Sequence, residues 1–522
     1  MPLFQRDEQI VARAVSGLVH GNPFLPERIE YERQALGPAF IATNPVWHPK
    51  IDLPENPNLP ALHAHVETLV ETARRRLDAG GPGARPGADE LALYEDLVFY
   101  LLFYRYFDDV FALIRDRSAG ARRVDVYDGF LRDLERYLAA PAGGVPSWGP
   151  PPHLFACVFQ IRRAFHFIHR NILGGSMPAA RLRAGVWQSI FTRDQRRYRR
   201  TLYQRLGDVT TLVTGPSGTG KELVARAIAL SRYIPFDPQT RRFTEDFGGS
   251  FYPLNLSALS PTLIESELFG HRRGAFTGAV QDRAGWLEVC LPLGTVFLDE
   301  IGEVDRGLQV KLLRVIETRS FQRLGDTRDR AFRGKIVGAT NRDLGVEMQA
   351  GRFRTDLYYR LCGDLIRTPS LREQLDDQPG ERRALVRSIV ERVSGPEDAQ
   401  GLTEEVERWI DTRLSADYGW PGNFRELEQC VRNVMIRGEY HPSSPRRATS
   451  RHRLAEDFAE GSLTADMLLR RYCTVVYAQT GSYQETARRL ELDRRTVRDK
   501  VDAELLAELR REGGGRDWNT TA

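Results

Sequence analysis

The sequence predicts a multidomain protein. An α/β domain with a parallel sheet and a helical lid stands between an α-helical N-terminal region and an all-α C-terminal domain. The length of 522 residues corresponds to three or four domains at about 150 residues each. Short apolar strands alternate with helical patterns from about residue 209 to residue 372, which favours a parallel sheet. Helical periodicity dominates before residue 183 and after residue 380.

Composition narrows the class of protein. Hydrophobic residues make up 41% of the chain and charged residues 28%, which excludes wholesale disorder. The net charge is only +4, so any contact with nucleic acid must come from a local patch. The five cysteines are widely separated, which predicts neither a disulfide framework nor a zinc site. No apolar run approaches a bilayer span, and the N-terminus lacks the apolar core of a signal peptide. We therefore expect a soluble, cytoplasmic protein with no membrane partner.

Changes in pattern along the chain predict five segments. We expect a helical regulatory domain over 1–183, the α/β domain over 184–440 with its lid from about 373, a linker over 441–462, a helical domain over 463–511 and a flexible tail over 512–522. The first segment has no phospho-acceptor receiver pattern, so only its position implies regulation. His166 and His169 lack a third ligand and are interpreted as helix-face residues. The signal that this segment receives stays open.

A glycine-rich loop links the apolar strand over 211–214 to a helical pattern, in the spacing G-x4-G-K. Glycines let backbone N–H groups turn toward a phosphate, the helix N-terminus adds partial positive charge, and Lys221 can reach the terminal phosphates. Glu222 stands where Ser or Thr normally binds magnesium, so the metal must be held mainly by another residue. The candidate nucleotide-binding residues are Gly215, Pro216, Ser217, Gly218, Thr219, Gly220, Lys221 and Glu222.

Two further strands deliver polar side chains. The strand over 295–298 ends in Asp299 and Glu300, which a doubly wound sheet would place beside the phosphate loop. Asp299 suits a magnesium ligand, and Glu300 suits polarising the attacking water. The strand over 335–340 ends in Thr340 and Asn341, where a polar side chain could order that water or sense the γ-phosphate.

Residues 186–440 resemble the AAA+ P-loop ATPase domain of bacterial enhancer-binding proteins, the activators of sigma-54 RNA polymerase. The resemblance rests on motifs in the family's order: GPSGTGKE (215–222), LIESELFGH (263–271), GAFTGA (274–279), GTVFLDEIGE (294–303), GATNRDL (338–344), FRTDLYYRL (353–361) and WPGNFREL (420–427). It implies that the domain takes ATP and Mg²⁺ and hydrolyses the nucleotide.

The GAFTGA string is the most specific of these motifs. In the family, this loop projects from an ATPase ring and touches sigma-54. Phe276 is an aromatic anchor between small residues, which lets the loop move and expose it. The expected sigma-54 contacts are Gly274, Ala275, Phe276, Thr277, Gly278 and Ala279.

The resemblance also implies roles for single residues. Asn255 matches the asparagine that holds the catalytic glutamate, here Glu300, in a nucleotide-dependent switch. Arg354 and Arg360 match arginine fingers that act on a neighbour's nucleotide, which implies a ring and most simply a hexamer. Arg425 matches the sensor II arginine, and Glu222 is the family's usual residue.

Three departures from the family pattern stand out. Residues 231–250 form a longer connection, and Cys362-Gly363 replaces Asn-Val. Residues 184–191 resemble the usual start of the domain only loosely, which leaves the adenine contacts open.

The C-terminal segment has helix–turn–helix spacing and resembles the Fis-type module. Ser482 and Asp493 can cap its second and third helices, and Glu491 occupies a turn position where φ is often positive. A helical oligomerisation cap is the alternative interpretation. The candidate DNA contacts are Arg494, Arg495, Thr496, Arg498 and Lys500.

Together these features predict a sigma-54-dependent transcriptional activator. We expect it to hydrolyse ATP to remodel the closed complex of sigma-54 RNA polymerase holoenzyme and promoter, and to bind enhancer DNA. Two alternatives stay open: an AAA+ ATPase that remodels another partner, and a DNA-binding regulator whose nucleotide site only controls assembly.

Overall fold

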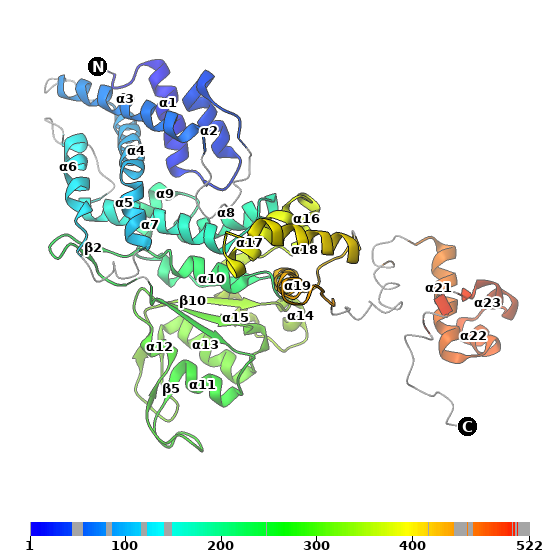
Figure 1. The fold of residues 1–522 in the computed structure, drawn as a ribbon. Coiled ribbons are helices and arrows are strands. Elements are labelled where there is room, and N and C mark those ends of the chain that lie inside the picture. The colour runs from blue at the N-terminus through cyan, green and yellow to red at the C-terminus, as the bar shows by residue number, and fades with distance from the viewer. Residues whose placement is uncertain are drawn as a thin grey trace. The chain divides into compact units, whose positions relative to one another are not determined.

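A computed structural model describes residues 2–43, 56–79, 86–115, 123–139, 149–246, 248–415, 417–442, 457, 463–503, 505, 506 and 509. Its contacts separate two compact units, Met1–Glu439 and Tyr440–Ala522 (Figure 1). Apart from residues 441, 442 and 457, the linker predicted over 441–462 lies outside the described residues, as does the tail predicted over 512–522.

The predicted helical N-terminal region is confirmed. Several of its helices are amphipathic: Val110 and Ile114 of α5 are buried, as are Tyr127, Phe130 and Leu134 of α6. Ser176 caps α8 by accepting a hydrogen bond from the N–H of Ala179. The helices are α1 (Arg6–His20), α2 (Glu27–Leu36), α3 (Asn58–Ala79), α4 (Ala88–Arg105), α5 (Phe107–Arg115), α6 (Val126–Leu138), α7 (Pro151–Asn171), α8 (Met177–Phe191) and α9 (Gln195–Arg197).

The predicted parallel sheet is also confirmed. Five strands pair in the order β11-β1-β10-β7-β4, and every pairing is parallel. All five carboxyl ends therefore meet at one edge, where ligands bind in such sheets. The strands are β1 (Thr211–Thr214), β4 (Phe251–Asn255), β7 (Thr295–Asp299), β10 (Lys335–Thr340) and β11 (Asp364–Arg367).

Helices cover both faces of the sheet (Figure 1). Side chains alternate across each strand, so Val213, Phe297 and Val337 join one hydrophobic core, whereas Leu212, Val296 and Ile336 join another. The first core contains residues of α10 (Lys221–Ala229), α7 and α8. The second contains residues of α11 (Pro261–Phe269), α12 (Trp286–Val289), α13 (Arg306–Thr318), α14 (Leu344–Gln349) and α15 (Thr355–Leu361).

A helical lid follows the last strand, close to the position expected from the sequence. Ser370 caps its first helix in a capping box with Glu373. Gly438 adopts a left-handed conformation, with φ of 72°, at the end of its last helix. The lid helices are α16 (Leu371–Asp377), α17 (Glu381–Ser394), α18 (Ala399–Arg413) and α19 (Asn423–Arg437).

The N-terminal helices share the first core with the parallel sheet. The boundary expected at residues 183 and 184 falls inside α8, which packs against α10, α16 and β11. The longer connection over 231–250 forms a small hairpin of β2 (Phe236–Asp237) and β3 (Arg242–Phe243) that packs on α7. There the rings of Phe159 and Phe243 stack at 4.0 Å. The hairpin thus fastens the N-terminal region to the α/β domain.

Within its described residues, the C-terminal unit contains the helices α21 (Ala465–Thr480), α22 (Tyr483–Leu490) and α23 (Arg494–Lys500). Ser482 and Asp493 cap the second and third, as predicted, and Glu491 has φ of 54°. None of the helices within the described ranges has the length and hydropathy needed to cross a membrane.

Candidate functional site

The glycine-rich loop lies between β1 and α10 in a conformation that few other residues could adopt. Gly215, Gly218 and Gly220 have φ of 146°, 76° and 89°. A Cβ at Gly215 would lie 2.2 Å from Thr368 Oγ1, and one at Gly218 would lie 2.2 Å from Gly422 O. The loop therefore leaves no room for a side chain at Gly215 or Gly218, and its place at the N-terminus of α10 would suit an anionic ligand.

Lys221 is the buried cation of this loop. Its Nζ donates hydrogen bonds to the carbonyl oxygens of Gly215 at 2.9 Å and Pro216 at 3.0 Å. Burial lowers the pKa of Lys221, while the nearby carboxyl groups of Glu300 and Asp299 oppose that shift. An ammonium held at the edge of the cradle by weak carbonyl partners can turn to a phosphate.

The predicted acid pair stands at the carboxyl end of β7. The backbone N–H of Glu300 donates to Asp299 Oδ1 at 3.0 Å, and Glu300 itself has φ of 56°. Burial, together with the charge of Glu300, raises the pKa of Asp299. A bound cation would relieve this cost, so Asp299 fits the metal position predicted for it.

The structure gives the two predicted asparagines different settings. Asn341 donates its backbone N–H to Glu300 Oε2 at 3.3 Å. Asn255 pairs in register with Asp299, but its Oδ1 accepts from the N–H and the hydroxyl of Ser257, each at 2.9 Å. Among the hydrogen bonds of the described residues, none joins Asn255 to Glu300. The arrangement expected from the resemblance is therefore not the one in this structure.

A cavity of about 460 Å³ unites most of the predicted nucleotide residues. Lid residues close one side of it, and residues from the end of α7 and from α8 contribute a further wall. Its lining includes Ser217, Gly218, Thr219, Gly220, Lys221, Glu222, Asn255, Asp299, Glu300, Arg425, Phe424, Ile389, Asn171, Ile172, Leu173 and Leu182.

Sequence reasoning missed several residues of this site. Asn423, with φ of 53°, donates from Nδ2 to Ser217 O at 2.9 Å and accepts at Oδ1 from the N–H of Leu371 at 2.8 Å. It thereby ties the phosphate loop to the lid. The sequence feature that could have identified Asn423 is its place in the turn Pro421-Gly422-Asn423. Ile172 and Leu173 precede the Gly-Gly break ahead of α8, a signal for the start of the domain before residue 184.

The two predicted arginine fingers lie outside the cavity lining of their own chain. Arg354 forms an ion pair with Asp356, with Nη2 to Oδ2 at 2.6 Å, and Arg360 pairs with Glu317, with Nε to Oε1 at 2.9 Å. Both pairs are solvent-accessible, so they constrain these arginines weakly.

The segment Gly274–Ala279 forms a tight turn within the hairpin of β5 (Gly270–His271) and β6 (Arg283–Ala284). Gly274 N–H donates to Ala279 O at 2.8 Å, and Gly274 and Gly278 have φ of 81° and 99°. The ring of Phe276 is half-buried against His271, 5.0 Å between centroids. The hairpin extends away from the lid helices in Figure 1. Thr277 and Gly278 are exposed, and Phe276 is partly covered.

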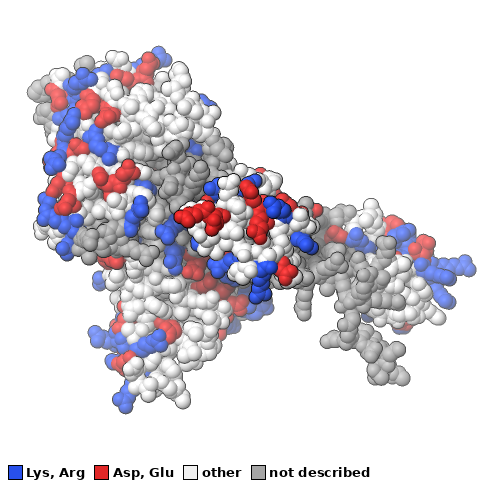
Figure 2. Space-filling model, in the orientation of Figure 1, with Lys and Arg blue, Asp and Glu red and all other residues white. Residues whose placement is uncertain are grey.

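The DNA candidates divide into two groups. Arg494, Arg495 and Arg498 are exposed on α23, whereas Thr496 is partly buried. Lys500 instead pairs with Asp466 of α21, with Nζ 2.5 Å from Oδ1. Figure 2 shows basic side chains gathered at one end of the C-terminal helices.

The strand order, the glycine-rich loop, the acid pair and the lid define the class: the α/β domain is an AAA+ P-loop domain. Residues 192–366 match the Sigma-54 interaction domain family. This match agrees with the resemblance inferred from the motifs.

Curated relatives agree with this assignment. The chain is 44% identical over 230 residues to the Nif-specific regulatory protein of Azotobacter vinelandii, covering 44% of this chain and 40% of that protein. It is 38% identical over 298 residues to the transcriptional regulatory protein ZraR of Salmonella typhi, covering 56% and 63%. The hydrogenase transcriptional regulatory protein HoxA of Bradyrhizobium diazoefficiens is 42% identical over 231 residues, covering 44% and 43%. The chain thus spans 40% to 63% of the length of these relatives.

A solved structure of NtrX from Brucella abortus in complex with ATP matches with a TM-score of 0.37 and 22% identity, covering 69% of this chain and 76% of that one.

Proposed function

We propose that this chain is an ATP-hydrolysing transcriptional activator that acts on sigma-54 RNA polymerase holoenzyme. The observation that carries the proposal is that one chain combines a cavity lined by Lys221, Asp299 and Glu300 with the GAFTGA turn, in a region that matches the Sigma-54 interaction domain family. The two alternatives explain these features less well. An ATPase that remodels another partner would have to re-use the GAFTGA turn for that partner, and a regulator in which the nucleotide only controls assembly would not need Asp299, Glu300 or the two arginine fingers.

Nucleotide binding is assigned to the cradle and its lysine. The backbone of Gly218 and Gly220 and the ammonium of Lys221 would hold the phosphates, and Arg425 would hold them from the lid. Asp299 would hold Mg²⁺, which neutralises charge on the phosphates when bound. Ile172, Leu173 and Leu182 provide an apolar wall that suits the adenine ring.

Hydrolysis is assigned to Glu300. Its carboxylate lines the cavity and accepts a hydrogen bond from the Asn341 backbone, which fixes its position for orienting a water molecule. Arg354 and Arg360 would reach the nucleotide of a neighbouring subunit in a ring, most simply a hexamer. Their exposed ion pairs could be exchanged for phosphate contacts.

Coupling to the polymerase is assigned to the GAFTGA turn. The strand β4 that ends at Asn255 lies next to β7, and the helix α11 that follows leads directly into the hairpin. If Asn255 exchanged its hydrogen bonds with Ser257 for one with Glu300, α11 and the hairpin would move. Phe276 would then separate from His271, and Thr277 would become accessible to sigma-54. Enhancer DNA binding is assigned to Arg494, Arg495 and Arg498 of the C-terminal unit.

One experiment separates these steps: ATP turnover and open-complex formation with sigma-54 polymerase, measured for four proteins. Wild type should perform both. Lys221→Ala should lose nucleotide binding, because the phosphates lose their cation. Glu300→Gln should bind ATP yet turn it over at least about 100-fold more slowly. Thr277→Ala should keep turnover and lose open complexes. Open complexes formed by Thr277→Ala would contradict the loop assignment, and normal turnover by Glu300→Gln would contradict the catalytic one.

A further inference from the structure

Residues 172–176, the α7–α8 connection, join helix α7 to helix α8 and form part of the wall of the nucleotide cavity. Ile172 and Leu173 of this connection line the cavity, and so does Leu182 of α8. The proposed function places the nucleobase against this apolar wall. The position of the connection therefore decides how well the cavity fits a base.

Two buried charges hold the connection from opposite ends of one peptide group. Arg183 Nη1 donates hydrogen bonds to Gly174 O at 2.6 Å and to Ile172 O at 3.2 Å. The N–H of Gly175 donates to Oε1 of Glu381, the first residue of the lid helix α17. Gly174 O and Gly175 N–H belong to the same rigid peptide group. That group therefore bridges a guanidinium on α8 and a carboxylate on the lid.

The bridge is buried, and its two charges support each other. Arg183 is 0% exposed and Glu381 is 1% exposed. Burial lowers the pKa of Arg183 to about 10, and the charge of Glu381 opposes that shift. Burial raises the pKa of Glu381, while the hydrogen bond from Gly175 and the charge of Arg183 oppose that shift. Since each charge offsets part of the cost of burying the other, the peptide group between them is held in one orientation.

The connection also packs directly on the lid. Gly174 has φ of 117°, and a Cβ there would lie 2.6 Å from Glu381 Oε1 and 2.8 Å from Gln374 Oε1. Gln374 belongs to the lid helix α16 and lines the nucleotide cavity. The N–H of Met177 donates to Asp377 Oδ2 of the same lid helix at 2.8 Å. Only glycine at position 174 therefore allows the lid side chains to come this close.

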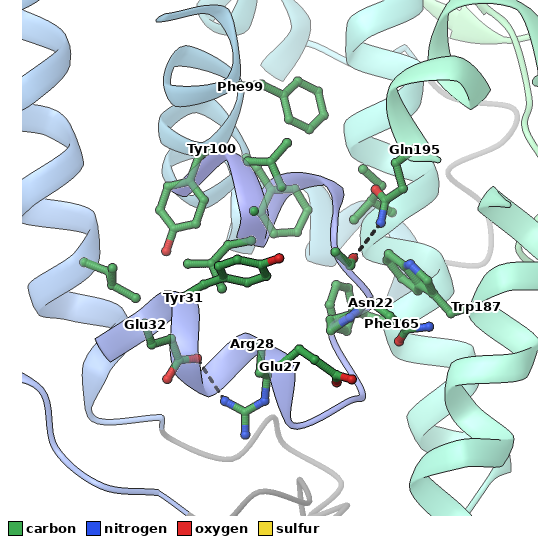
Figure 3. A pocket seen from close by; sticks show the side chains of 18 of the residues that line it. Asn22, Glu27, Arg28, Tyr31, Glu32, Phe99, Tyr100, Phe165, Trp187 and Gln195 are labelled. Carbon is green, nitrogen blue, oxygen red and sulfur yellow. Dashed lines mark hydrogen bonds and ion pairs between the residues drawn. The ribbon is translucent and has the colours of Figure 1, made fainter. Parts of the chain in front are cut away.

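Helix α8 is anchored beyond Arg183, which gives this side chain a fixed base. Asn22 Nδ2, from the loop between α1 and α2, donates to Ala184 O at 3.0 Å. The rings of Trp187 and Phe165 lie 5.0 Å apart between centroids. Figure 3 shows Asn22, Phe165 and Trp187 on the same side of a cavity between the N-terminal helices. Arg183 thus extends from a fixed helix to the connection, and the lid meets the connection from the other side.

We propose that Arg183 and Glu381 are positioning residues for nucleotide binding, and that the peptide group between them transmits contact of the base with the α7–α8 connection to the lid. This inference rests on the proposed function, because it needs a nucleotide in the cavity. Leu385, Ile389 and Arg392 continue the face of α17 that begins at Glu381, and all three line the same cavity. A base that packs on the connection therefore also sets the lid side chains that close over the nucleotide.

The positioning role of Arg183 is tested on the full-length protein by calorimetric titration with two ligands in the presence of Mg²⁺. A non-hydrolysable ATP analogue has a base, and inorganic tripolyphosphate has none. In Arg183→Met, the ratio of analogue affinity to tripolyphosphate affinity should fall at least about tenfold, because the connection loses its preorganisation. Affinity for tripolyphosphate itself should stay near the wild-type value, since the glycine-rich loop lies between β1 and α10. General destabilisation would weaken both ligands alike.

Two further variants make the comparison specific. Arg183→Lys should lower the affinity ratio less, about threefold, because an ammonium keeps the charge and can bond one of the two carbonyl groups. The matched control is Arg181→Met, the same substitution at an exposed position of the same helix, which should keep the wild-type ratio. Thermal unfolding reports whether each variant folds, and Arg183→Lys decides if Arg183→Met does not. A wild-type ratio in the folded Arg183 variants overturns the positioning role.

Coupling to the lid is measured in wild type by hydrogen exchange of the backbone amides over 381–394. Saturating analogue should slow this exchange at least about threefold more than saturating tripolyphosphate does. Glu381→Gln, which removes the charge, should reduce this difference by at least about half. Equal protection by the two ligands in wild type, or an undiminished difference in Glu381→Gln, overturns the coupling. Binding of neither ligand to wild type contradicts the proposed function, and the coupling with it.

Discussion

The two buried lysines of the α/β domain illustrate how position decides the role of a residue. In a chain whose usual cation is arginine, Lys221 and Lys335 both lie inside the fold, at 7% and 4% exposure. Lysine shifts its pKa on burial far more readily than arginine. Lys221 lines the nucleotide cavity, whereas Lys335 is the first residue of β10 and its Nζ donates a hydrogen bond to Val209 O at 2.6 Å. Only the first lies in the cavity to which we assign the nucleotide.

Lys335 predicts a pH dependence of stability. Burial lowers its pKa to about 8 in the folded protein, well below that of an unfolded lysine. Between these values the unfolded state binds more protons, so stability should rise with pH. Relative to Lys335→Met, wild type should gain up to about 3 kcal/mol of unfolding free energy between pH 8 and pH 10.5. Denaturant unfolding of both proteins at several pH values from 8 to 10.5 measures this difference, and an equal pH dependence of the two unfolding free energies would contradict it.

At this scale the sequence predicts residues whose chemistry follows from local pattern. Lys221, Asp299 and Glu300 lie where a strand, a loop and a helix place them, and they line one cavity. Asn423 escapes such reasoning, because its hydrogen bonds reach residues about 50 and 200 positions away. The role of Asn255 likewise depends on whether its side chain forms hydrogen bonds with Ser257 or with Glu300. The sequence pattern does not determine which of these two partners it has.

At the scale of the elements, the C-terminal helices carry basic side chains in two different settings, ion-paired and exposed. Lys500 ends α23 and pairs with Asp466 at the start of α21, so it joins two helices. Arg495 is exposed, and its backbone N–H bonds the cap residue Asp493 at 2.7 Å. Two basic residues of one short helix therefore have different surroundings: Lys500 is ion-paired within the unit, and Arg495 is exposed.

Substituting each residue with alanine should separate these tasks. Arg495→Ala should weaken DNA binding about tenfold and reduce the dependence of affinity on salt by about one ion, without changing the melting temperature. Lys500→Ala should lower the melting temperature of the C-terminal unit and leave the salt dependence unchanged. Fluorescence anisotropy with duplex DNA at several salt concentrations, beside thermal unfolding, tests both. The reverse pattern would show that Lys500 is the DNA contact.

The sequence predicts well those helices that begin at an N-cap residue and those strands that stand out as short apolar runs. Ser482, Asp493 and the strand over 295–298 carry local signals, and the structure has them where expected. The start of the α/β domain is harder to predict, because α8 is buried on most of its sides and packs against both the N-terminal helix α7 and the strand β11 of the sheet. Helical periodicity does not reveal which neighbour a helix has.

For the whole molecule, the main consequence is that residues 1–183 and the α/β domain form one structural unit. The first hydrophobic core runs from α1 through α7 and α8 to the sheet residues Val213 and Phe297. Mixed charges cover the outer surface of these helices in Figure 2. A change in the packing of the N-terminal helices can therefore reach the sheet directly, without a hinge between separate domains.

Truncated chains test whether the N-terminal helices and the α/β domain depend on one shared hydrophobic core. A chain starting at residue 184 would cut α8 and expose Phe297 and Val337, so it should aggregate or melt without cooperativity. A chain ending at residue 462 loses only the second unit and should keep the melting temperature of the first. Differential scanning calorimetry with dye binding to exposed apolar surface measures both. A cooperative, soluble protein starting at residue 184 would contradict the shared core.

The central claim is that the nucleotide state governs contact between the Phe276 turn and sigma-54. Its most direct test is a size-exclusion assay of complex formation between the full-length protein and purified sigma-54. With ADP–aluminium fluoride, which imitates the hydrolysis transition state, wild type should co-elute with sigma-54, and Phe276→Ala should not. With ADP alone neither should. Co-elution that is independent of nucleotide, or its absence with the analogue, would contradict the account.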